Sequence, residues 1–338
     1  MSCLIVDEKL NSWQEISGNW PFILLGNGFS INIWSGFSYN SLYDKACELK
    51  VLNKFSQNIF KKTNDFNFEK ILRILYYSKM TSDVFGQEKA QTLAENAYKN
   101  VQEALISAVS TSHLSRGKDG LSGVLKDIGD CLLEYKKIFT TNYDLILYWA
   151  LSEREFIGFK DLFWGKGGSF PISDLSVYDN SNIVYYLHGA LHLVVDSNGV
   201  CKKLYYAAVN NAEDIYKSSG EDGFPLFISE GKSKHKFLKI KSNNYLGHIY
   251  DEFSRLEDSL LVLGHSLSEE VDGHIIEAIK NNASLKRLAV GIYPNQAEEE
   301  IIEFKARTHR QLGKEKSIVF FDSATHPLTS PTLNLDEL

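Results

Sequence analysis

Closely spaced cysteines are missing from this sequence of 338 residues. Its four cysteines, Cys3, Cys47, Cys131 and Cys201, lie far apart, so no C-x-x-C pair offers the ligand spacing of a structural zinc site. Scattered thiols also give no dense disulfide framework, which is typical of a chain kept reduced in the cytoplasm. We therefore expect free cysteines, no bound metal and a cytoplasmic protein.

Long apolar stretches are missing as well. No run approaches the roughly 20 residues that a membrane-spanning helix needs. The N-terminal residues, Met-Ser-Cys-Leu-Ile-Val-Asp-Glu-Lys, have no basic start followed by an apolar stretch, so a signal peptide is not expected. The sequence predicts no interaction with a membrane.

A basic excess is the third absence. Lysine and arginine number 36 against 43 aspartates and glutamates, and the net charge is −7. Proteins that mainly bind nucleic acid need positive charge to neutralise phosphates, so nucleic acid is disfavoured here without being excluded. One local basic stretch remains, made of Lys232, Lys234, His235, Lys236, Lys239 and Lys241. It is more typical of a solvated loop or edge strand than of its alternative, a phosphate clamp or nucleic-acid trigger.

Six apolar runs, bounded by glycines or polar turns, predict the strands of an α/β domain. They are 22–25, 137–140, 183–187, 260–263, 288–292 and 318–321. Helical patterns at 121–135, 245–256, about 270–281 and about 296–312 alternate with the later runs. Because the runs are apolar on both faces, we expect a Rossmann-like, mostly parallel, doubly wound sheet covered by helices.

Two insertions interrupt this alternation in a single predicted domain of residues 1–325. A helical insertion at about 60–115 follows the first strand, with apolar periods through Ile71 and Leu75 and through Leu93 and Val101. A loop and hairpin insertion at about 193–240 follows the third strand, with a turn at Asp196-Ser197-Asn198-Gly199. Residues 326–338 would form a C-terminal tail.

The turn Gly26-Asn27-Gly28-Phe29-Ser30 directly follows the first strand. Glycines there would let backbone N–H groups approach a phosphate, and the following helix would favour negative charge. A dehydrogenase fingerprint requires a third glycine where this chain has Ile31, which weakens that interpretation. A plain glycine turn is the alternative.

Two further motifs follow the second and third strands. In Thr140-Thr141-Asn142-Tyr143-Asp144, an amide and a carboxylate two residues apart suit ribose hydroxyls, although Asp144 could equally cap a helix. His188-Gly189 offers a base that titrates near neutrality. The alternative is a structural histidine, and nearby His192 could equally be the functional one.

The fourth motif, Gly264-His265-Ser266-Leu267-Ser268, closes the fourth strand and precedes Asp272. It fits a loop beside ribose or phosphate. The competing interpretation is a nucleophile elbow with Ser266, Asp322 and His326 in the order of a serine hydrolase triad. The elbow requires a glycine where Ser268 stands.

The four motifs, in this order at four strand ends, resemble the sirtuin-like NAD-binding superfamily. The resemblance covers about residues 20–325 and is nearest to a prokaryotic branch without the zinc module, long described as a domain of unknown function. Sirtuin deacylases carry zinc on two close cysteine pairs, which this chain lacks, so acyl-lysine deacylation is not expected. The resemblance instead implies an NAD hydrolase that depletes NAD in antiphage defence.

The resemblance also implies roles for individual residues. Asn142, Asp144 and His188 would be catalytic, with His188 accepting a proton. NAD would be the substrate, bound by Gly26, Asn27, Gly28, Ser30, Thr141, Gly264, Ser266 and Asp272. A non-catalytic sensor of NAD or ADP-ribose would use the same pocket. The activity of a toxic NAD hydrolase must be restrained until it is needed. A homo-oligomeric switch or an activating partner is therefore expected, but no residue identifies either.

Overall fold

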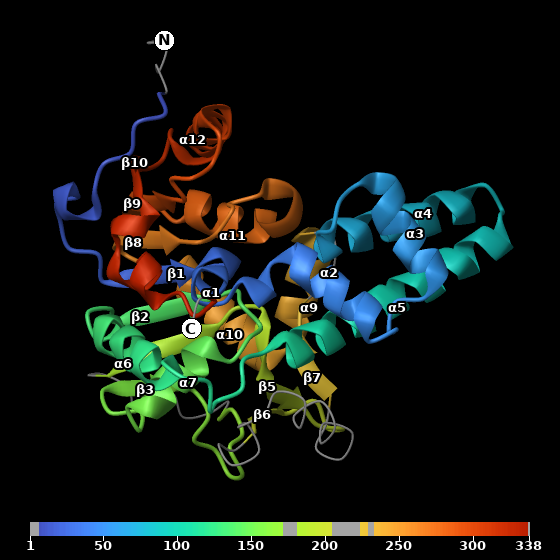
Figure 1. Cartoon of the computed structure of the whole chain (residues 1–338), viewed down its shortest axis with the longest axis horizontal. Coiled ribbons are helices and arrows are strands. Elements are labelled where there is room, and N and C mark those ends of the chain that lie inside the picture. The colour runs from blue at the N-terminus through green and yellow to red at the C-terminus, as the bar shows by residue number, and fades with distance from the viewer. Residues whose placement is uncertain (1–6, 172–180, 205–223, 229–232, 337–338) are drawn as a thin grey trace.

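A seven-stranded sheet forms the centre of the computed structural model, which describes residues 7–171, 181–204, 224–228 and 233–336 (Figure 1). The strands pair in the order β10 (Ser317–Asp322), β9 (Leu285–Ile292), β8 (Asp258–Leu263), β1 (Phe22–Leu25), β2 (Lys137–Thr140), β4 (Asn182–Tyr186) and β3 (Phe159–Asp161). Every neighbouring pair is parallel. From β1 the chain adds strands toward β3, and from β8 it adds strands toward β10. The boundary between β1 and β8 is therefore the topological switch point, where ligands bind in open α/β sheets.

All six apolar runs of the sequence are strands of this sheet, so the predicted α/β class is confirmed. The additional strand, β3, was not predicted. It has only three residues and lies at the sheet edge, where Lys160 is exposed between buried Phe159 and Asp161. Such a short segment has too few apolar residues to show a pattern.

Helices flank the sheet and supply the expected alternation (Figure 1). They are α1 (Asn27–Ile33), α6 (Leu121–Leu132), α7 (Ile146–Glu153), α10 (Asn244–Ser254), α11 (Glu269–Asn281) and α12 (Glu298–Leu312). In α6, for example, buried Leu121, Val124, Leu125, Ile128 and Leu132 recur at the spacing of one helix face. The helices predicted from periodicity are therefore confirmed. None in the described part of the chain is long and apolar enough to cross a lipid bilayer.

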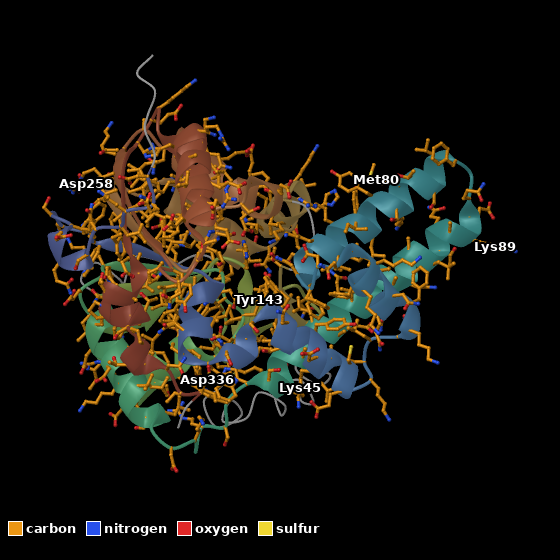
Figure 2. The ribbon with its side chains drawn as sticks, turned by 45° about the horizontal axis from the view of Figure 1, so that its top comes forward. Lys45, Met80, Lys89, Tyr143, Asp258 and Asp336 are labelled. Carbon is orange, nitrogen blue, oxygen red and sulfur yellow. The ribbon has the colours of Figure 1, made fainter. Side chains whose placement is uncertain are left out.

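The helical insertion between β1 and β2 is larger than expected. It contains α2 (Tyr39–Glu48), α3 (Lys54–Thr63), α4 (Phe68–Val84) and α5 (Glu88–Ser112), so it begins near residue 39 rather than 60. The side chains of Ser38, Asn53 and Asn67 cap α2, α3 and α4. The α4–α5 hairpin extends away from the sheet, with Met80 and Lys89 at its far end (Figures 1 and 2).

The second insertion contains the predicted hairpin. Strands β5 (Gly189–Val195) and β6 (Cys201–Lys203) are antiparallel around the turn 196–199, and β7 (Phe224–Phe227) pairs with β5. The hairpin begins at Gly189, earlier than expected. Parts of the insertion, including Lys232, lie outside the described residues. The basic stretch is not a loop or edge strand but the helix α9 (Ser233–Ser242).

The predicted C-terminal tail packs against the domain through residue 335. Leu328, Leu333 and Leu335 are buried, and the Leu335 amide donates to the Ile33 carbonyl at the end of α1. The described part of this segment is therefore a component of the core.

Candidate functional site

Four loops meet at the carboxyl edge of the sheet. Leu25 at the end of β1 is paired with Thr140 of β2 and with Leu263 of β8, and Thr140 is paired with Tyr186 of β4. The strands therefore end at one level, and the residues that follow them form neighbouring loops. This register brings together the four motifs that the sequence singled out.

The glycines of the first loop pack against the loop after β8. The Gly26 amide donates to the Leu263 carbonyl and the Gly28 amide to the Gly264 carbonyl, both at 2.9 Å. A Cβ atom on Gly28 would lie 2.8 Å from Gly264 Cα, and one on Gly264, whose φ is +65°, would lie 2.3 Å from the Phe29 nitrogen. The prediction that these two amides bind phosphate is wrong, because both already have partners in the chain.

Ser30 and Asp144 lie behind Asn142 and orient its side chain. Asn142 Nδ2 donates to the Gly26 carbonyl at 3.0 Å and to Ser30 Oγ at 2.8 Å. Ser30 Oγ donates in turn to Asp144 Oδ2 at 2.6 Å. Since a backbone carbonyl only accepts, the amide nitrogen must face Gly26. Asn142 Oδ1 is then buried without a hydrogen-bond partner in the described chain.

Asp144 accepts a backbone hydrogen bond at the start of α7, as expected of a capping residue, whereas its contact with a ribose hydroxyl stays a prediction. One carboxylate oxygen accepts from the Ile146 amide at the start of α7, and the other holds Ser30. Burial raises the pKa of Asp144 above 3.8, whereas the hydrogen bonds from Ser30 and Ile146 act in the opposite direction. Ser30 itself is fully buried. The predicted contact of Ser30 with a ligand is therefore replaced by a positioning role.

His188 faces a second histidine that the sequence did not single out. Its Nε2 lies 2.9 Å from Nε2 of His274 on α11 and 3.8 Å from Asp272 Oδ1. Burial lowers the pKa of His188 well below 6.5, and Lys236 lowers it further. His188 is therefore neutral at pH 7, and its pKa does not lie near neutrality as the sequence suggested.

His192 is a core residue. Its ring stacks on Tyr148 at 4.3 Å between centroids and meets Tyr186 edge-on, and it is fully buried. It does not line the cavity described below, whereas His188 does. Of the two histidines, the structure places His188 at the site.

A buried ion cluster borders the site and joins three elements. Lys236 Nζ of α9 lies 2.7 Å from Glu69 Oε1 of α4 and 2.9 Å from Asp272 Oδ1 of α11. Burial alone would raise the pKa of Asp272, but the Lys236 ammonium holds it below its usual range. Burial likewise would lower the pKa of Lys236, and the two carboxylates raise it instead. The solvated interpretation of the basic stretch is wrong for Lys236, which is fully buried.

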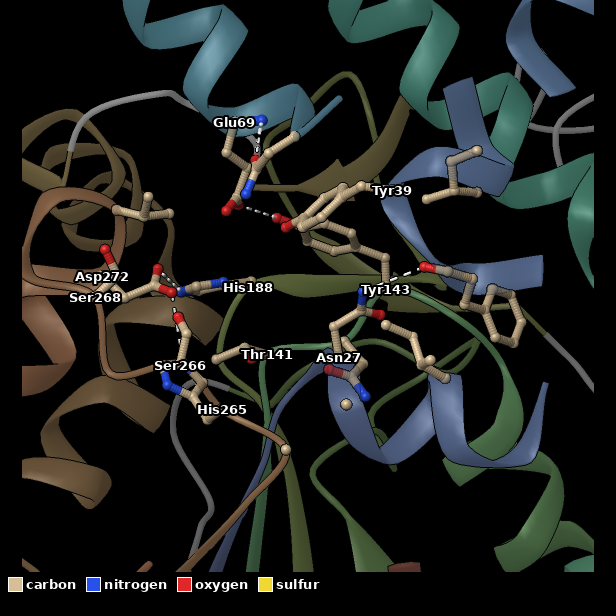
Figure 3. Close-up of a pocket in the computed structure, with 18 of the residues that line it drawn as sticks. Asn27, Tyr39, Glu69, Thr141, Tyr143, His188, His265, Ser266, Ser268 and Asp272 are labelled. Carbon is tan, nitrogen blue, oxygen red and sulfur yellow. Dashed lines mark hydrogen bonds and ion pairs between the residues drawn. The ribbon is translucent and has the colours of Figure 1, made fainter. Parts of the chain in front are cut away.

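A cavity of about 460 Å³ opens over these loops (Figure 3). It is lined by every predicted site residue except Gly26 and Ser30, namely Asn27, Gly28, Thr141, Asn142, Asp144, His188, Gly264, Ser266 and Asp272. Unpredicted lining residues include Tyr39, Glu69, Tyr143, His265 and Ser268. The insertion contributes Tyr39 and Glu69, whose helical pattern showed no sign of a ligand site.

A second cavity of about 780 Å³ adjoins the first and shares Gly28, Gly264, His265 and Ser266 with it. Arg307 of α12 lines both cavities. Its guanidinium donates to the Ser266 carbonyl at 2.9 Å, while its Nε is buried without a partner among the described residues. This arginine places a fixed positive charge between the two cavities.

The structure contradicts the triad of the serine hydrolase interpretation. His326 Nε2 is 2.9 Å from the Tyr135 hydroxyl, and its Nδ1 accepts from the Leu328 amide, so neither ring nitrogen is available to Ser266. Asp322 accepts from the Ala324 amide and caps a short 3-10 helix. The three residues form no triad.

The cysteines at 47, 131 and 201 are free, and Cys3 lies outside the described residues.

Comparison with known proteins places the chain in a family without assigning an activity. No curated protein matches the chain. The family model for the Domain of unknown function (DUF4917) matches residues 23–328, nearly the whole domain with its four loops and both insertions, and the chain belongs to this family.

Proposed function

We propose that this protein cleaves NAD at the bond between nicotinamide and ribose. Attack by water would release nicotinamide and ADP-ribose, and attack by a group of the same NAD molecule would release nicotinamide and a cyclic form. The observation that carries the proposal is Asn142 Oδ1, which has no hydrogen-bond partner among the described residues and is buried at a cavity that His188 also lines. Buried polar atoms normally have partners, so an orphaned acceptor at a cavity supports a ligand donor there. A water molecule or a ribose hydroxyl would supply it.

The two adjoining cavities suit a dinucleotide. Small-molecule sites usually measure roughly 300–1,000 Å³, and the two cavities of about 460 and 780 Å³ would each take one nucleoside half. Arg307, at their junction, would pair with the pyrophosphate between the halves. It takes the role that the Gly26 and Gly28 amides cannot fulfil, while Gly264 and Ser266 would lie near the adenosine ribose.

The nicotinamide half would occupy the first cavity. As its bond to ribose breaks, positive charge develops on the sugar, and the carboxylates of Asp272 and Glu69 would stabilise that charge. Asn142 Oδ1 would orient the attacking water, and Asp144 would act through Ser30 to hold Asn142. His188 would take the proton from the water as its oxygen bonds to the ribose carbon and nicotinamide leaves.

Incubation of the purified protein with NAD, followed by mass-spectrometric identification of products, tests the proposal. His188→Ala and Asn142→Ala should each lower turnover by about 100-fold or more. His309→Ala and Asn198→Ala, outside the cavities, are matched controls. Intact NAD after prolonged incubation, or full activity of both cavity variants, would overturn the assignment.

A second candidate is a sensor that binds NAD or ADP-ribose without cleaving it. The contact of His188 with His274 and the lowered pKa of His188 favour it, because they make the ring a weak base. A sensor would be stabilised against thermal unfolding by NAD and would release no nicotinamide. Depletion of NAD in antiphage defence, the setting that the sequence resemblance implies, follows only if cleavage occurs.

A further inference from the structure

Three buried side chains converge at one side of the first cavity. A ring nitrogen of His188, a ring nitrogen of His274 and a carboxylate oxygen of Asp272 all lie within 4.8 Å of one another. The two histidine nitrogens are only 2.9 Å apart. Figure 3 shows His188 and Asp272 directed at one another across this part of the cavity.

The convergence depends on a local distortion of α11. Residues two apart on a regular helix point to nearly opposite sides. Asp272, however, has φ −123° and ψ 33°, which interrupts the helix and lets Asp272 and His274 face the same point.

The hydrogen bonds around the cluster leave lone pairs at its centre. At most one proton fits between the two Nε2 atoms, so at least one of them presents a lone pair to the other. His274 Nδ1 lies 3.2 Å from Ser233 Oγ. This hydroxyl can accept a hydrogen bond from the imidazole when the ring proton is on Nδ1. His188 and His274 can therefore both direct Nε2 lone pairs inward after a tautomer shift that releases no net proton.

His265 completes the surroundings without being a ligand. Its Nδ1 accepts from the Leu267 amide, so the proton of the neutral ring sits on Nε2, which faces Asp272 Oδ2 at 3.5 Å. Glu69 and Asp272 together carry one more negative charge than Lys236 compensates. The cluster thus offers two neutral imidazoles and a carboxylate in a locally acidic environment.

We propose that His188, His274 and Asp272 bind one divalent metal ion of the kind represented by zinc. Two nitrogens 2.9 Å apart can both reach a single ion at the usual zinc–nitrogen distance of about 2.0–2.1 Å. Two imidazoles and a carboxylate are a common zinc ligand set, and Ser233 supplies the outer partner that orients a ligating imidazole. The fourth position would face the cavity.

Binding of the ion has a consequence that rests on the proposed function. The ion would occupy Nε2 of His188, and if this nitrogen is the one that accepts the proton in NAD cleavage, the two uses compete for one lone pair. Metal occupancy and NAD cleavage would then exclude one another, and zinc would act as an inhibitor rather than a cofactor.

The test uses untagged full-length protein freed of metal with a chelator. Titration with Co²⁺, followed by visible absorption, and with Zn²⁺, in competition with a chromogenic chelator, should show one equivalent bound. His274→Ala and Asp272→Asn should each weaken binding by about 10-fold or more. His309→Ala, a histidine on α12 outside the cluster, should bind as the wild type does.

A measurement on the wild type keeps the test decisive if a variant fails to fold. Nitrogen NMR of the imidazoles should show two histidine rings changing on addition of Zn²⁺. No bound equivalent, equal binding by wild type and variants, or no change at histidine nitrogens would overturn the proposal.

Assays with NAD separate the two proposals. Metal binding by a protein that leaves NAD intact would support the metal site and contradict NAD hydrolysis. NAD cleavage that continues unchanged with one equivalent of zinc bound would overturn the inclusion of His188 among the ligands.

Discussion

The side-chain nitrogen of Asn142 donates a 2.8 Å hydrogen bond to the hydroxyl of Ser30, and this bond helps determine which end of the amide faces the cavity. Ser30 does not line the cavity, so its effect on a ligand passes through Asn142. The relationship makes Ser30 a positioning residue whose contribution can be separated from direct contact.

Ser30→Ala should lower kcat for NAD by about 10- to 100-fold and leave KM nearly unchanged, because the Asn142 side-chain nitrogen loses its acceptor Ser30 Oγ and Asn142 Oδ1 shifts. Steady-state kinetics measures both parameters. Ser78→Ala, an exposed serine on α4, is the control. An unchanged kcat in the Ser30 variant would show that Asn142 is held by the Gly26 carbonyl alone.

Gly264→Ala should destabilise the fold through two effects, strain at φ +65° and a Cβ atom 2.3 Å from the Phe29 nitrogen. Gly199→Ala is a matched control, since Gly199 has φ +78° and nothing within 4 Å of an added Cβ. The control should lose about 1–2 kcal/mol from strain alone, and Gly264→Ala clearly more. Urea unfolding gives both values, and equal losses would contradict the close packing of the two loops.

Lys236→Met should reduce the free energy of unfolding by about 3–5 kcal/mol at pH 7, because it leaves Glu69 and Asp272 buried without their cation. Lys234→Met, an exposed lysine of the same helix, should change it by less than about 0.5 kcal/mol. Equal effects of the two substitutions would contradict the buried ion cluster.

The pH dependence of the Lys236→Met protein gives a second check. In the wild type, Lys236 keeps the pKa of Asp272 below 3.8, so its contribution is lost only as the pH falls below that value. Without Lys236, burial would raise the pKa of the carboxyls, and protonation would stabilise the folded variant. The difference between variant and wild type should therefore shrink from pH 7 to pH 5.

The sheet and the general position of the site could be predicted from the sequence. Apolar runs such as 260–263 are buried on both faces, and parallel strands align their carboxyl ends, so Asn142, His188 and Ser266 had to lie near one edge. What could not be predicted depends on contacts between distant segments. Lys236 looked like any lysine of a basic stretch until Glu69, 167 residues away, was placed against it.

The roles of single atoms also could not be predicted. The partners of the Gly26 and Gly28 amides depend on how closely the loop after β8 approaches, which no spacing in the first motif reveals. The convergence of Asp272 and His274 depends on the non-helical backbone at Asp272, whereas helical periodicity would have placed these two residues on nearly opposite sides of α11.

His326 predicts how stability depends on pH. The ring is buried, its Nδ1 accepts from the Leu328 amide, and burial lowers the pKa from 6.5 to about 3. The unfolded chain therefore takes up a proton at His326 before the folded one does. Its contribution to stability is complete above pH 6.5 and is lost progressively as the pH falls toward about 3.

His326→Asn isolates this contribution, because asparagine can still accept from the Leu328 amide as a helix cap but does not titrate. Between pH 7.5 and pH 5, the wild type should lose about 2 kcal/mol more unfolding free energy than the variant, since each pH unit below 6.5 costs about 1.4 kcal/mol. Urea unfolding at pH values across this interval measures both slopes. Because other buried histidines titrate equally in the two proteins, parallel slopes would mean that His326 is protonated in the folded state.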